Sequence, residues 1–498
     1  MNKQISLISR FLMSLILGLS LTGLTSIITK AQTLPVTTSS QEALQLFKEG
    51  QNKLANVQRN DAEALFQQAI QKDPNFAQAY LFLALSSGDY NVINNSLKKA
   101  EKLSDKASPD EQKFIKCVLA DFEGNNSKQK RYLDQLLNKY PNDNIIQMTA
   151  GNYYYGQNEY QTAIEHYNKA LAANPDFAQA YNMIGYCQSQ LGNYEESENA
   201  FKSYIKMVPN NPNPHDSYAE LLMKMGKYDE SIAQYNQALK IDPDFISAYR
   251  GIGDNYIFKG DFATARTYYD KQFDHAKAVG DKLNAMRMKT ISYVHEGNIP
   301  EAIQTLDKER TFAQNEKQIP DIIDTHLTSS LIYSMTGNPQ EGLKHNDEAA
   351  SLIEKEPLPD PLKKLMTVDM MLNRTHVLTM SGQYDQAMAE ANEVKKMIDQ
   401  HQNKNEMENW NLAMGVLQVR QNKNEEALSY LKKANSDSPV TWFYKASAYE
   451  KMGNKEKSAK LYKKVGTWNV NNIGLALVRN TALNKMKSSG VSTSETRK

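Results

Sequence analysis

Hydrophobic and small residues recur along this chain at helical spacing, and the whole pattern repeats every 34 residues. A glycine or asparagine marks each repeat, at Gly124, Asn158, Gly192, Gly226 and Gly260. Five residues after each marker comes a mostly small residue, namely Gln129, Ala163, Ser197, Ser231 and Ala265, and nine residues after it a bulky one, namely Leu133, Tyr167, Phe201, Tyr235 and Tyr269. Residues four apart share one face of a helix, so an amphipathic helix is predicted after each marker.

The marker and a later proline bound the two helices of each unit. Glycine and asparagine tolerate the left-handed conformation that commonly ends a helix, so each marker predicts a tight turn. Prolines follow with the same period at Pro141, Pro175, Pro209 and Pro243. Because proline cannot continue a helix, it closes the second helix. Each unit is therefore predicted to be helix, turn, helix, loop.

The first helix of each unit carries a repeated pair in which a bulky residue precedes a very small one. These pairs are Ile184-Gly185, Tyr218-Ala219 and Ile252-Gly253. The small member permits close packing of helices. Since one hairpin cannot bury its own apolar face, successive units must stack. We therefore predict an all-α fold, a right-handed α-solenoid of stacked helix-turn-helix repeats.

Further units extend the array in both directions. Upstream, residues 62–74 form a unit with a degenerate turn and residues 96–100 mark a weaker one. Downstream, the turn residue recurs at irregular steps, at Gly297, Gly337, Gly382, Asn422 and Gly453. Twelve candidate units result. We expect regular repeats over 41–279, longer and divergent repeats over 280–470, a capping helix over 471–487 and a disordered tail over 488–498.

The spacing of small residue, aromatic residue, small residue and proline resembles the tetratricopeptide repeat. It is seen at Ala163, Tyr167, Ala170 and Pro175, again at Ser231, Tyr235, Ala238 and Pro243, and its other half at Trp442, Ala446 and Tyr449 before Gly453. The resemblance covers about residues 41–465. It implies that the first helices line a concave face that binds a protein or peptide partner. The positions that it implies for partner contacts are Asn152, Tyr155, Asn182, Tyr186, Asp216, Glu220, Arg250 and Asp254.

These positions would make a polar groove of mixed charge. Some members of the resembled family hold a C-terminal carboxylate with a clamp of lysine and asparagine side chains. Asn152 matches one clamp position, but Met148 and Asn213 stand where the clamp needs lysine. We therefore do not expect that clamp here.

The charges balance, which argues against a nucleic-acid partner. The chain has 58 Lys and Arg against 57 Asp and Glu, and no run of five like charges. Residues 1–31 combine Lys3 and Arg10 with an apolar run over 11–24, which predicts a signal peptide cleaved after Ala31. A short tether over 32–40 would follow, and the mature protein would be exported, periplasmic or secreted. An uncleaved anchor is the alternative, although this run is short of the ~20 residues that cross a bilayer.

Candidate chemistry is sparse. Cys117 and Cys187 lie about two units apart, too far for a disulfide in a linear array, so both are expected to be buried and unpaired. The eight histidines show no pair at the i, i+4 spacing of a helical metal site, and the mature chain has no phosphate-cradling, dinucleotide or nucleophile-elbow motif. We predict no catalytic residue, no metal and no cofactor, and hence no enzyme.

Three functions follow from this pattern. The first is an exported scaffold whose concave face binds a protein or peptide partner. The second is a glycan- or small-ligand-binding envelope protein, or an accessory subunit of a surface carbohydrate system, with Tyr155 and Tyr186 as stacking platforms. The third is an enzyme whose site is assembled from the divergent C-terminal units, for which no linear motif is visible.

Overall fold

The structure is a computed structural model that describes residues 33–55, 58–401 and 403–488. This part of the chain forms 25 helices and no strand. The helices are α1 (Gln41–Ala55), α2 (Arg59–Lys72), α3 (Ala77–Ser86), α4 (Tyr90–Ser104), α5 (Pro109–Phe122), α6 (Asn126–Lys139), α7 (Asn144–Gly156), α8 (Tyr160–Ala173), α9 (Ala178–Leu191), α10 (Tyr194–Met207), α11 (Asn213–Lys224), α12 (Tyr228–Ile241), α13 (Ile246–Lys259), α14 (Phe262–His275), α15 (Val279–Glu296), α16 (Ile299–Asn315), α17 (Ile319–Met335), α18 (Pro339–Lys355), α19 (Asp360–Met380), α20 (Tyr384–His401), α21 (Lys404–Arg420), α22 (Asn424–Leu431), α23 (Pro439–Lys451), α24 (Lys455–Gly466) and α25 (Ile473–Ser488).

The turns between paired helices adopt the conformation that the sequence predicts. Every predicted turn residue has a positive φ, between 61° and 98°, at Gly124, Asn158, Gly192, Gly226, Gly260, Gly297, Gly337, Gly382, Asn422 and Gly453. Each of these residues ends the first helix of a hairpin and starts the turn into the second. The all-α solenoid of stacked hairpins is thus confirmed, with the helices pairing in order along the chain.

Close contact between a small residue and an aromatic ring holds each hairpin together. A Cβ atom built on Gly151 would lie 2.3 Å from the Tyr167 ring, and one built on Gly185 would lie 2.5 Å from the Phe201 ring. Gly253 meets Tyr269 in the same way. The rings at these positions are fully buried. The core therefore runs along the array as a series of clusters between successive helices.

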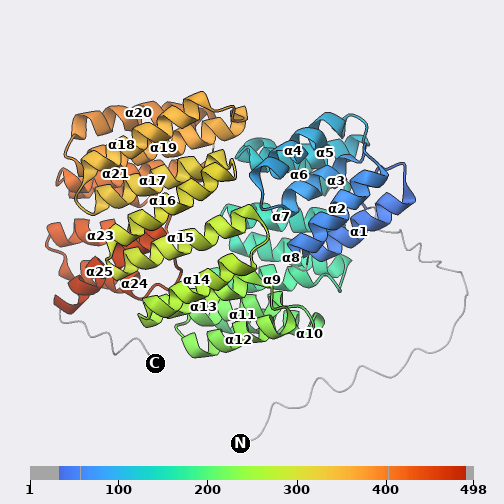
Figure 1. Ribbon diagram of the computed structural model, residues 1–498, viewed down its shortest axis with the longest axis horizontal. Helices are drawn as coiled ribbons and strands as arrows, with labels where there is room; N and C mark the ends of the chain where they lie inside the picture. The colour runs from blue at the N-terminus through green and yellow to red at the C-terminus, as the bar shows by residue number, and fades with distance from the viewer. Residues whose placement is uncertain (1–32, 56–57, 402, 489–498) are drawn as a thin grey trace, which may run out of the picture.

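First helices lie on the inside of the curve and second helices on the outside. Successive first helices, such as α9 and α11, α11 and α13, or α17 and α19, pack directly against each other. No two successive second helices pack as closely in the described residues. The inner surface is therefore built from α7, α9, α11, α13 and their counterparts in the other hairpins. In Figure 1 the colour order follows the array from blue α1 to red α25.

The array bends until distant parts of it touch. α25 packs against α24 and also against α15, far away in the sequence (Figure 1). Near the other end, Gly88, between α3 and α4, meets Gly280 in α15, where an added Cβ would lie 2.3 Å from the Gly88 carbonyl oxygen. Lys404 Nζ donates to the Gln157 carbonyl oxygen at 2.5 Å. The solenoid is therefore a curled body rather than an open rod.

Residues 33–40, which the sequence predicts to be a tether, are bound to the first hairpins. The Leu34 amide donates to Asp143 Oδ2 at 2.7 Å, and the Thr37 amide donates to Glu111 Oε1 at 2.6 Å. The Ser39 amide donates to Asp73 Oδ2 at 2.7 Å. Leu34 and Val36 also pack on the apolar cluster of α1–α7. The tether prediction missed these buried carboxylates because they come from three separate repeats.

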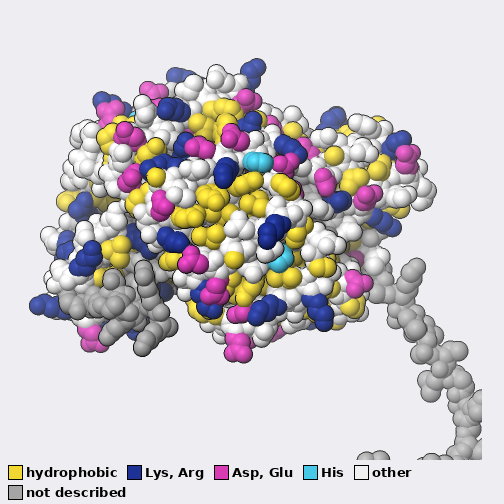
Figure 2. Space-filling model, turned by 60° about the horizontal axis from the view of Figure 1, so that its bottom comes forward, with side chains coloured by type: hydrophobic (Ala, Val, Ile, Leu, Met, Phe, Trp, Pro, Cys, Tyr) yellow, Lys and Arg dark blue, Asp and Glu magenta, His cyan; other side chains and the backbone are white. Residues whose placement is uncertain are grey.

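Several other predictions from the sequence can be compared with the structure. Cys117 and Cys187 are buried and unpaired, as predicted. The predicted signal peptide over 1–31 and nearly all of the predicted tail over 488–498 lie outside the described residues. Among the described helices, none is long and apolar enough to cross a membrane. On the face drawn in Figure 2, acidic and basic side chains are interspersed, in keeping with the balanced formal charge of the whole chain.

Candidate functional site

The residues predicted to contact a partner occupy the first helices of four successive hairpins. α7 carries Asn152 and Tyr155, α9 carries Asn182 and Tyr186, α11 carries Asp216 and Glu220, and α13 carries Arg250 and Asp254. On α9, α11 and α13 the two residues are four apart and share one helix face. The 34-residue period places the members of these pairs in two rows that run across the three helices.

Three of these side chains form one contact chain across α9, α11 and α13. Tyr186 Oη donates to Glu220 Oε2 at 2.7 Å, and Arg250 Nη2 lies 3.8 Å from Glu220 Oε1. Glu220 and Arg250 remain 33% and 39% exposed, so both are open to solvent on the inner surface. The structure therefore brings these predicted residues into contact and leaves the side chains of Glu220 and Arg250 partly exposed.

Asp216 and Asp254 are the buried acids of this surface. Burial, reinforced by the charge of Glu220 and opposed by Arg250, holds the pKa of Asp216 well above its ordinary value. Burial also raises the pKa of Asp254, to about 6, against the lowering effects of Arg250 and of two hydrogen bonds. These bonds come from Tyr269 Oη and Asn471 Nδ2, both at 2.7 Å. Asp216 has no corresponding donor.

The other predicted residues lie beside this group without bonding to it. Asn152 Oδ1 accepts from Tyr167 Oη at 2.9 Å, and its side chain is exposed. The Tyr155 ring packs edge-on against Tyr160, with 5.5 Å between centroids. Asn182 is 6% exposed, and its Oδ1 has no hydrogen-bond partner. Asn182 therefore leaves a buried acceptor one helical turn before Tyr186.

A segment of the chain itself is bound on the inner surface of α13 and α15. Residues 468–472, the non-helical link between α24 and α25, place Asn471 between Asp254, Tyr269 and His295. Asn471 donates to Asp254, and its Oδ1 lies 3.0 Å from His295 Nε2. Tyr228 Oη donates to Asn469 Oδ1 at 2.9 Å. We call residues 468–472 the linker segment; nothing in the repeat pattern pointed to these contacts.

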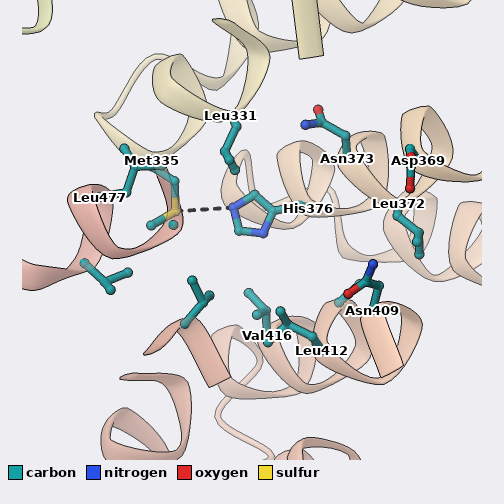
Figure 3. Close-up of a pocket in the computed structure, with 14 residues that line it drawn as sticks. Leu331, Met335, Asp369, Leu372, Asn373, His376, Asn409, Leu412, Val416 and Leu477 are labelled. Carbon is teal, nitrogen blue, oxygen red and sulfur yellow. Dashed lines mark hydrogen bonds between the residues drawn. The ribbon is translucent and has the colours of Figure 1, made fainter. Parts of the chain in front are cut away.

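A cavity of about 300 Å³ opens among α17, α19, α21, α23 and α25. Most of its walls are aliphatic, and Figure 3 shows Leu331, Leu412 and Leu477 converging on it from three helices. His376 Nε2 lies 3.3 Å from Met335 Sδ, and burial lowers the pKa of His376 to about 4. Burial and nearby acids raise the pKa of Asp369 to about 6. The sequence pattern gives no sign of this cavity, because its residues come from five helices with irregular spacing.

Two histidines that are far from i, i+4 spacing in the sequence lie close together in the structure. His326 and His345, on paired helices α17 and α18, bring their Nδ1 atoms to 3.1 Å. Burial, reinforced by Arg310, lowers the pKa of both imidazoles, which favours their neutral forms. Within the described residues, no group of three or more His, Cys, Asp or Glu side chains is arranged to hold a metal ion.

The fold and this surface define a helical-repeat solenoid with an inner face of polar and charged side chains. Residues 148–212 and 440–469 match family models described as tetratricopeptide repeat, and residues 219–260 match one described as TPR repeat. The chain is a tetratricopeptide repeat protein. The first two matches along the chain contain seven of the eight predicted contact residues, among them the linker-binding Asp254, and Asp216 lies between them.

Relatives with curated names match parts of the array. The chain is 26% identical over 183 residues to Tetratricopeptide repeat protein 13 of Homo sapiens, covering 36% of this chain and 20% of that protein. It is 26% identical over 162 residues to the Hsp70-Hsp90 organizing protein of Triticum aestivum, covering 32% of this chain and 26% of that protein. The matched region is therefore about a quarter or less of each relative.

Solved structures with the same kind of repeat are also similar to this chain. A tetratricopeptide repeat protein from Parabacteroides merdae is 19% identical, with 57% of this chain and 99% of that chain covered and a TM-score of 0.32. YrrB, described as a TPR protein with an unusual peptide-binding site, is 18% identical, with coverages of 37% and 97% and a TM-score of 0.25.

Proposed function

We propose that this protein is an exported, non-enzymatic scaffold that binds a non-helical segment of a protein partner along the inner faces of α7, α9, α11 and α13. The observation that carries the proposal is the linker segment. Asp254, Tyr269 and His295 already hold Asn471 by side-chain hydrogen bonds on this surface. The name of the wheat relative, an organizing protein for Hsp70 and Hsp90, supports a protein as the partner.

Binding on such a surface needs no catalytic group. Tetratricopeptide repeat proteins are typically scaffolds, and a stacked array presents a preformed surface with little ordering left to do. Affinity would come from a few well-placed contacts among many modest ones. Glu220 and Arg250, on neighbouring helices and both open to solvent, offer an acceptor and a donor to the same ligand. Export rests on the signal-like residues 1–31.

Affinity purification tests the binding proposal. Residues 32–498 are used as bait against envelope and culture fractions of the native cells, beside a variant with Asn182→Ala, Asp216→Asn and Arg250→Ala together. A matched control carries Glu195→Gln, Asp229→Asn and Lys240→Ala, all exposed on the second helices α10 and α12. We expect a partner retained by the control and lost by the inner-face variant. A partner retained equally by both variants would contradict the proposed surface.

Cell fractionation tests export. The full chain carrying a C-terminal epitope tag is expressed in its own host, and the mass of the mature form is measured. We expect a periplasmic or secreted protein that begins at Gln32. A full-length form confined to the cytoplasm would rule out export without touching the binding proposal.

The cavity in Figure 3 favours a second candidate function, the binding of a small apolar ligand. Its size suits a small ligand or one large side chain, and its aliphatic walls suit an apolar group better than a sugar. The neutral fluorescent probe N-phenylnaphthylamine tests this function. Leu412→Trp should fill the cavity and abolish probe fluorescence enhancement, whereas an unchanged signal would place the probe elsewhere. Binding of the protein to sugars on a glycan array, in place of probe binding in the cavity, would instead favour a carbohydrate-binding function.

A further inference from the structure

Asn182 on α9 and Asp216 on α11 are mostly buried side chains with an oxygen that accepts no hydrogen bond, and in Asn182 that oxygen is fully enclosed. Asp216 is 7% exposed, and its carboxylate accepts no hydrogen bond within the described part of the chain. Asn182, one repeat earlier on α9, is 6% exposed and leaves Oδ1 without a partner. A buried polar group without a partner is costly, so native proteins rarely leave one unless something else completes it.

The neighbouring repeat shows what completes such an acceptor. Asp254, on α13, is also 7% exposed, yet it accepts hydrogen bonds from Tyr269 and from Asn471 of the linker segment. One of these two donors therefore belongs to a non-helical piece of chain, the linker segment, which lies on the inner surface. Asp216, on α11 one hairpin upstream, is also buried; it lies one helical turn before Glu220, the residue that corresponds to Asp254 in the repeat, and no piece of the chain supplies it with a donor.

The charges around Asp216 favour a positively charged donor. Three carboxylates, Asp216, Glu220 and Asp254, surround a single guanidinium, that of Arg250. Arg250 lies 3.8 Å from Glu220 and forms no ion pair with Asp216. With Asp216 protonated, the carboxylates of Glu220 and Asp254 stand against one guanidinium, and ionisation of Asp216 makes the balance three negative against one positive, so a cation would be attracted and an anion repelled.

We infer that Asn182, Asp216 and Glu220 form a subsite for a lysine or arginine side chain carried by the non-helical segment of the partner. Its N–H groups would donate to Asp216 and Asn182 from the inner surface, and Glu220 would add a second negative charge. This inference rests on the proposed function and names the chemistry of its ligand. The ligand group at this surface would be a cation, whereas the clamp of some family members binds a carboxylate.

Proton release accompanies binding at such a subsite. A bound cation favours ionised Asp216, whereas burial and Glu220 favour the protonated acid in the free protein. Affinity should therefore rise with pH through the range in which Asp216 titrates. The charged and titratable groups that interact with Asp216 are Glu220 on its own helix, Tyr186 on α9, Tyr204 on α10, Tyr235 on α12 and Arg250 on α13; Asp254, also on α13, interacts with Arg250 and Glu220.

Fluorescence anisotropy with two matched peptides tests the inference. The probes are fluorophore-labelled acetyl-Gly-Ser-Arg-Ser-Gly-amide and the same peptide with neutral citrulline in place of arginine, each titrated with residues 32–498. We expect the arginine peptide to bind about tenfold tighter, which corresponds to roughly 1.4 kcal/mol. Asp216→Asn should abolish that preference, and Arg250→Met should increase it by removing the competing cation.

Two measurements separate a lost subsite from a lost fold. Asp229→Asn, an acid 88% exposed on the second helix α12, is the matched control and should keep the preference. Circular dichroism should show unchanged helix content in Asp216→Asn, because a neutral amide replaces a carboxyl that already resists ionisation. Calorimetry in phosphate and Tris buffers should show fractional proton release for the protein and none for Asp216→Asn.

Three results would overturn the inference. Equal affinity for both peptides would show that charge is not recognised, and no binding of either at about 10 mM would show that no such subsite exists. A preference kept by Asp216→Asn would put the cation elsewhere. If a partner still needs the inner face in the purification experiment while any of these holds, the scaffold function stands and only its ligand chemistry is wrong.

Discussion

Single glycines decide how closely neighbouring helices approach in this array. Gly185 and Gly253 were predicted from the bulky-small pairs, and each lies against the ring of its own hairpin. Gly251 was not singled out, although its contact is the tightest of this kind. A Cβ built on it would lie 2.0 Å from Tyr235 Cζ, across the boundary between two hairpins. The sequence motif describes contacts within a unit better than those between units, which depend on how the units stack.

Gly251→Ala should destabilise the protein by about 1–3 kcal/mol. The methyl group has no room beside the fully buried Tyr235 ring, so α12 and α13 must separate. Gly156→Ala is the control, because nothing lies within 4 Å of its added Cβ and it is helical and exposed. Alanine there should leave stability unchanged or raise it by up to about 1 kcal/mol. The urea midpoints of unfolding measure both changes in stability. An unchanged midpoint for Gly251→Ala would contradict the stacking of these hairpins.

Glu309 is a buried acid whose environment opposes its ionisation. Its side chain is fully buried on α16, with Oε1 accepting from Arg287 Nε at 2.9 Å while Oε2 has no partner. Burial raises the pKa of Glu309 to about 7 despite the nearby guanidinium. Because one carboxylate oxygen has no hydrogen-bond partner, the attraction to Arg287 does not offset the hydration that the ionised Glu309 would lose.

Stability should therefore fall as pH rises from about 4.5 to about 7, because the unfolded state loses a proton that folded Glu309 retains. One such group contributes up to about 1.4 kcal/mol per pH unit. Glu309→Gln should reduce this fall, leaving the shares of other acids whose pKa values are also raised, among them Asp216, Asp254 and Asp369. The urea midpoints of unfolding at about pH 5 and about pH 7.5 measure this pH dependence of stability, and Glu354→Gln, at an exposed position, is the control. An unchanged pH dependence in Glu309→Gln would refute the assignment.

At the scale of the helical hairpin, the turn residue fixes where one helix ends. Gly226 has φ of +78°, and the nearest atom to an added Cβ is Asn469 Nδ2 at 3.7 Å. A side chain there would be strained by its backbone conformation rather than by a clash. The same position in other repeats is filled by asparagine, at Asn158 and Asn422, which tolerates positive φ.

Gly226→Val should lower the melting temperature, at a loss of at least about 1–2 kcal/mol for a β-branched residue in the left-handed region. Asn158→Gly, the equivalent turn two hairpins earlier, keeps a permissive residue and should change stability by only a few tenths of a kcal/mol. Differential scanning fluorimetry compares the two. Equal melting temperatures for Gly226→Val and the unaltered protein would mean that the turn is not held at positive φ.

Helices and turns were predictable from this sequence because they depend on local spacing. The binding surface was predictable only in part. Glu220 and Arg250 could be placed near one another from the repeat period, whereas the pairing of Asp254 with Asn471 could not, since 217 residues separate them. The bound segment at 33–40 and the cavity at His376 were missed for the same reason. Each depends on residues from several units that meet only after the array curves.

The whole molecule is closed by contacts between hairpins that are distant in sequence. Asn480 Nδ2 donates to the His295 carbonyl oxygen at 2.9 Å, which ties α25 to α15. At the other end of α15, its first turn meets the loop between α3 and α4. Tyr90, the first residue of α4, joins an apolar cluster with Ile319 and Ile323. Small rotations between repeats accumulate along an array, so curvature is a property of the stack. No single repeat encodes it.

Gly280→Ala tests this closure at the point of closest approach. Alanine favours a helix over glycine by about 1 kcal/mol, so α15 itself should not suffer. The added methyl group would lie 2.3 Å from the Gly88 carbonyl oxygen, a backbone atom that cannot turn aside. We expect an increased radius of gyration in small-angle X-ray scattering, with unchanged helix content by circular dichroism. Gly156→Ala should leave the scattering unchanged, and an identical profile for Gly280→Ala would mean that the two hairpins do not touch in solution.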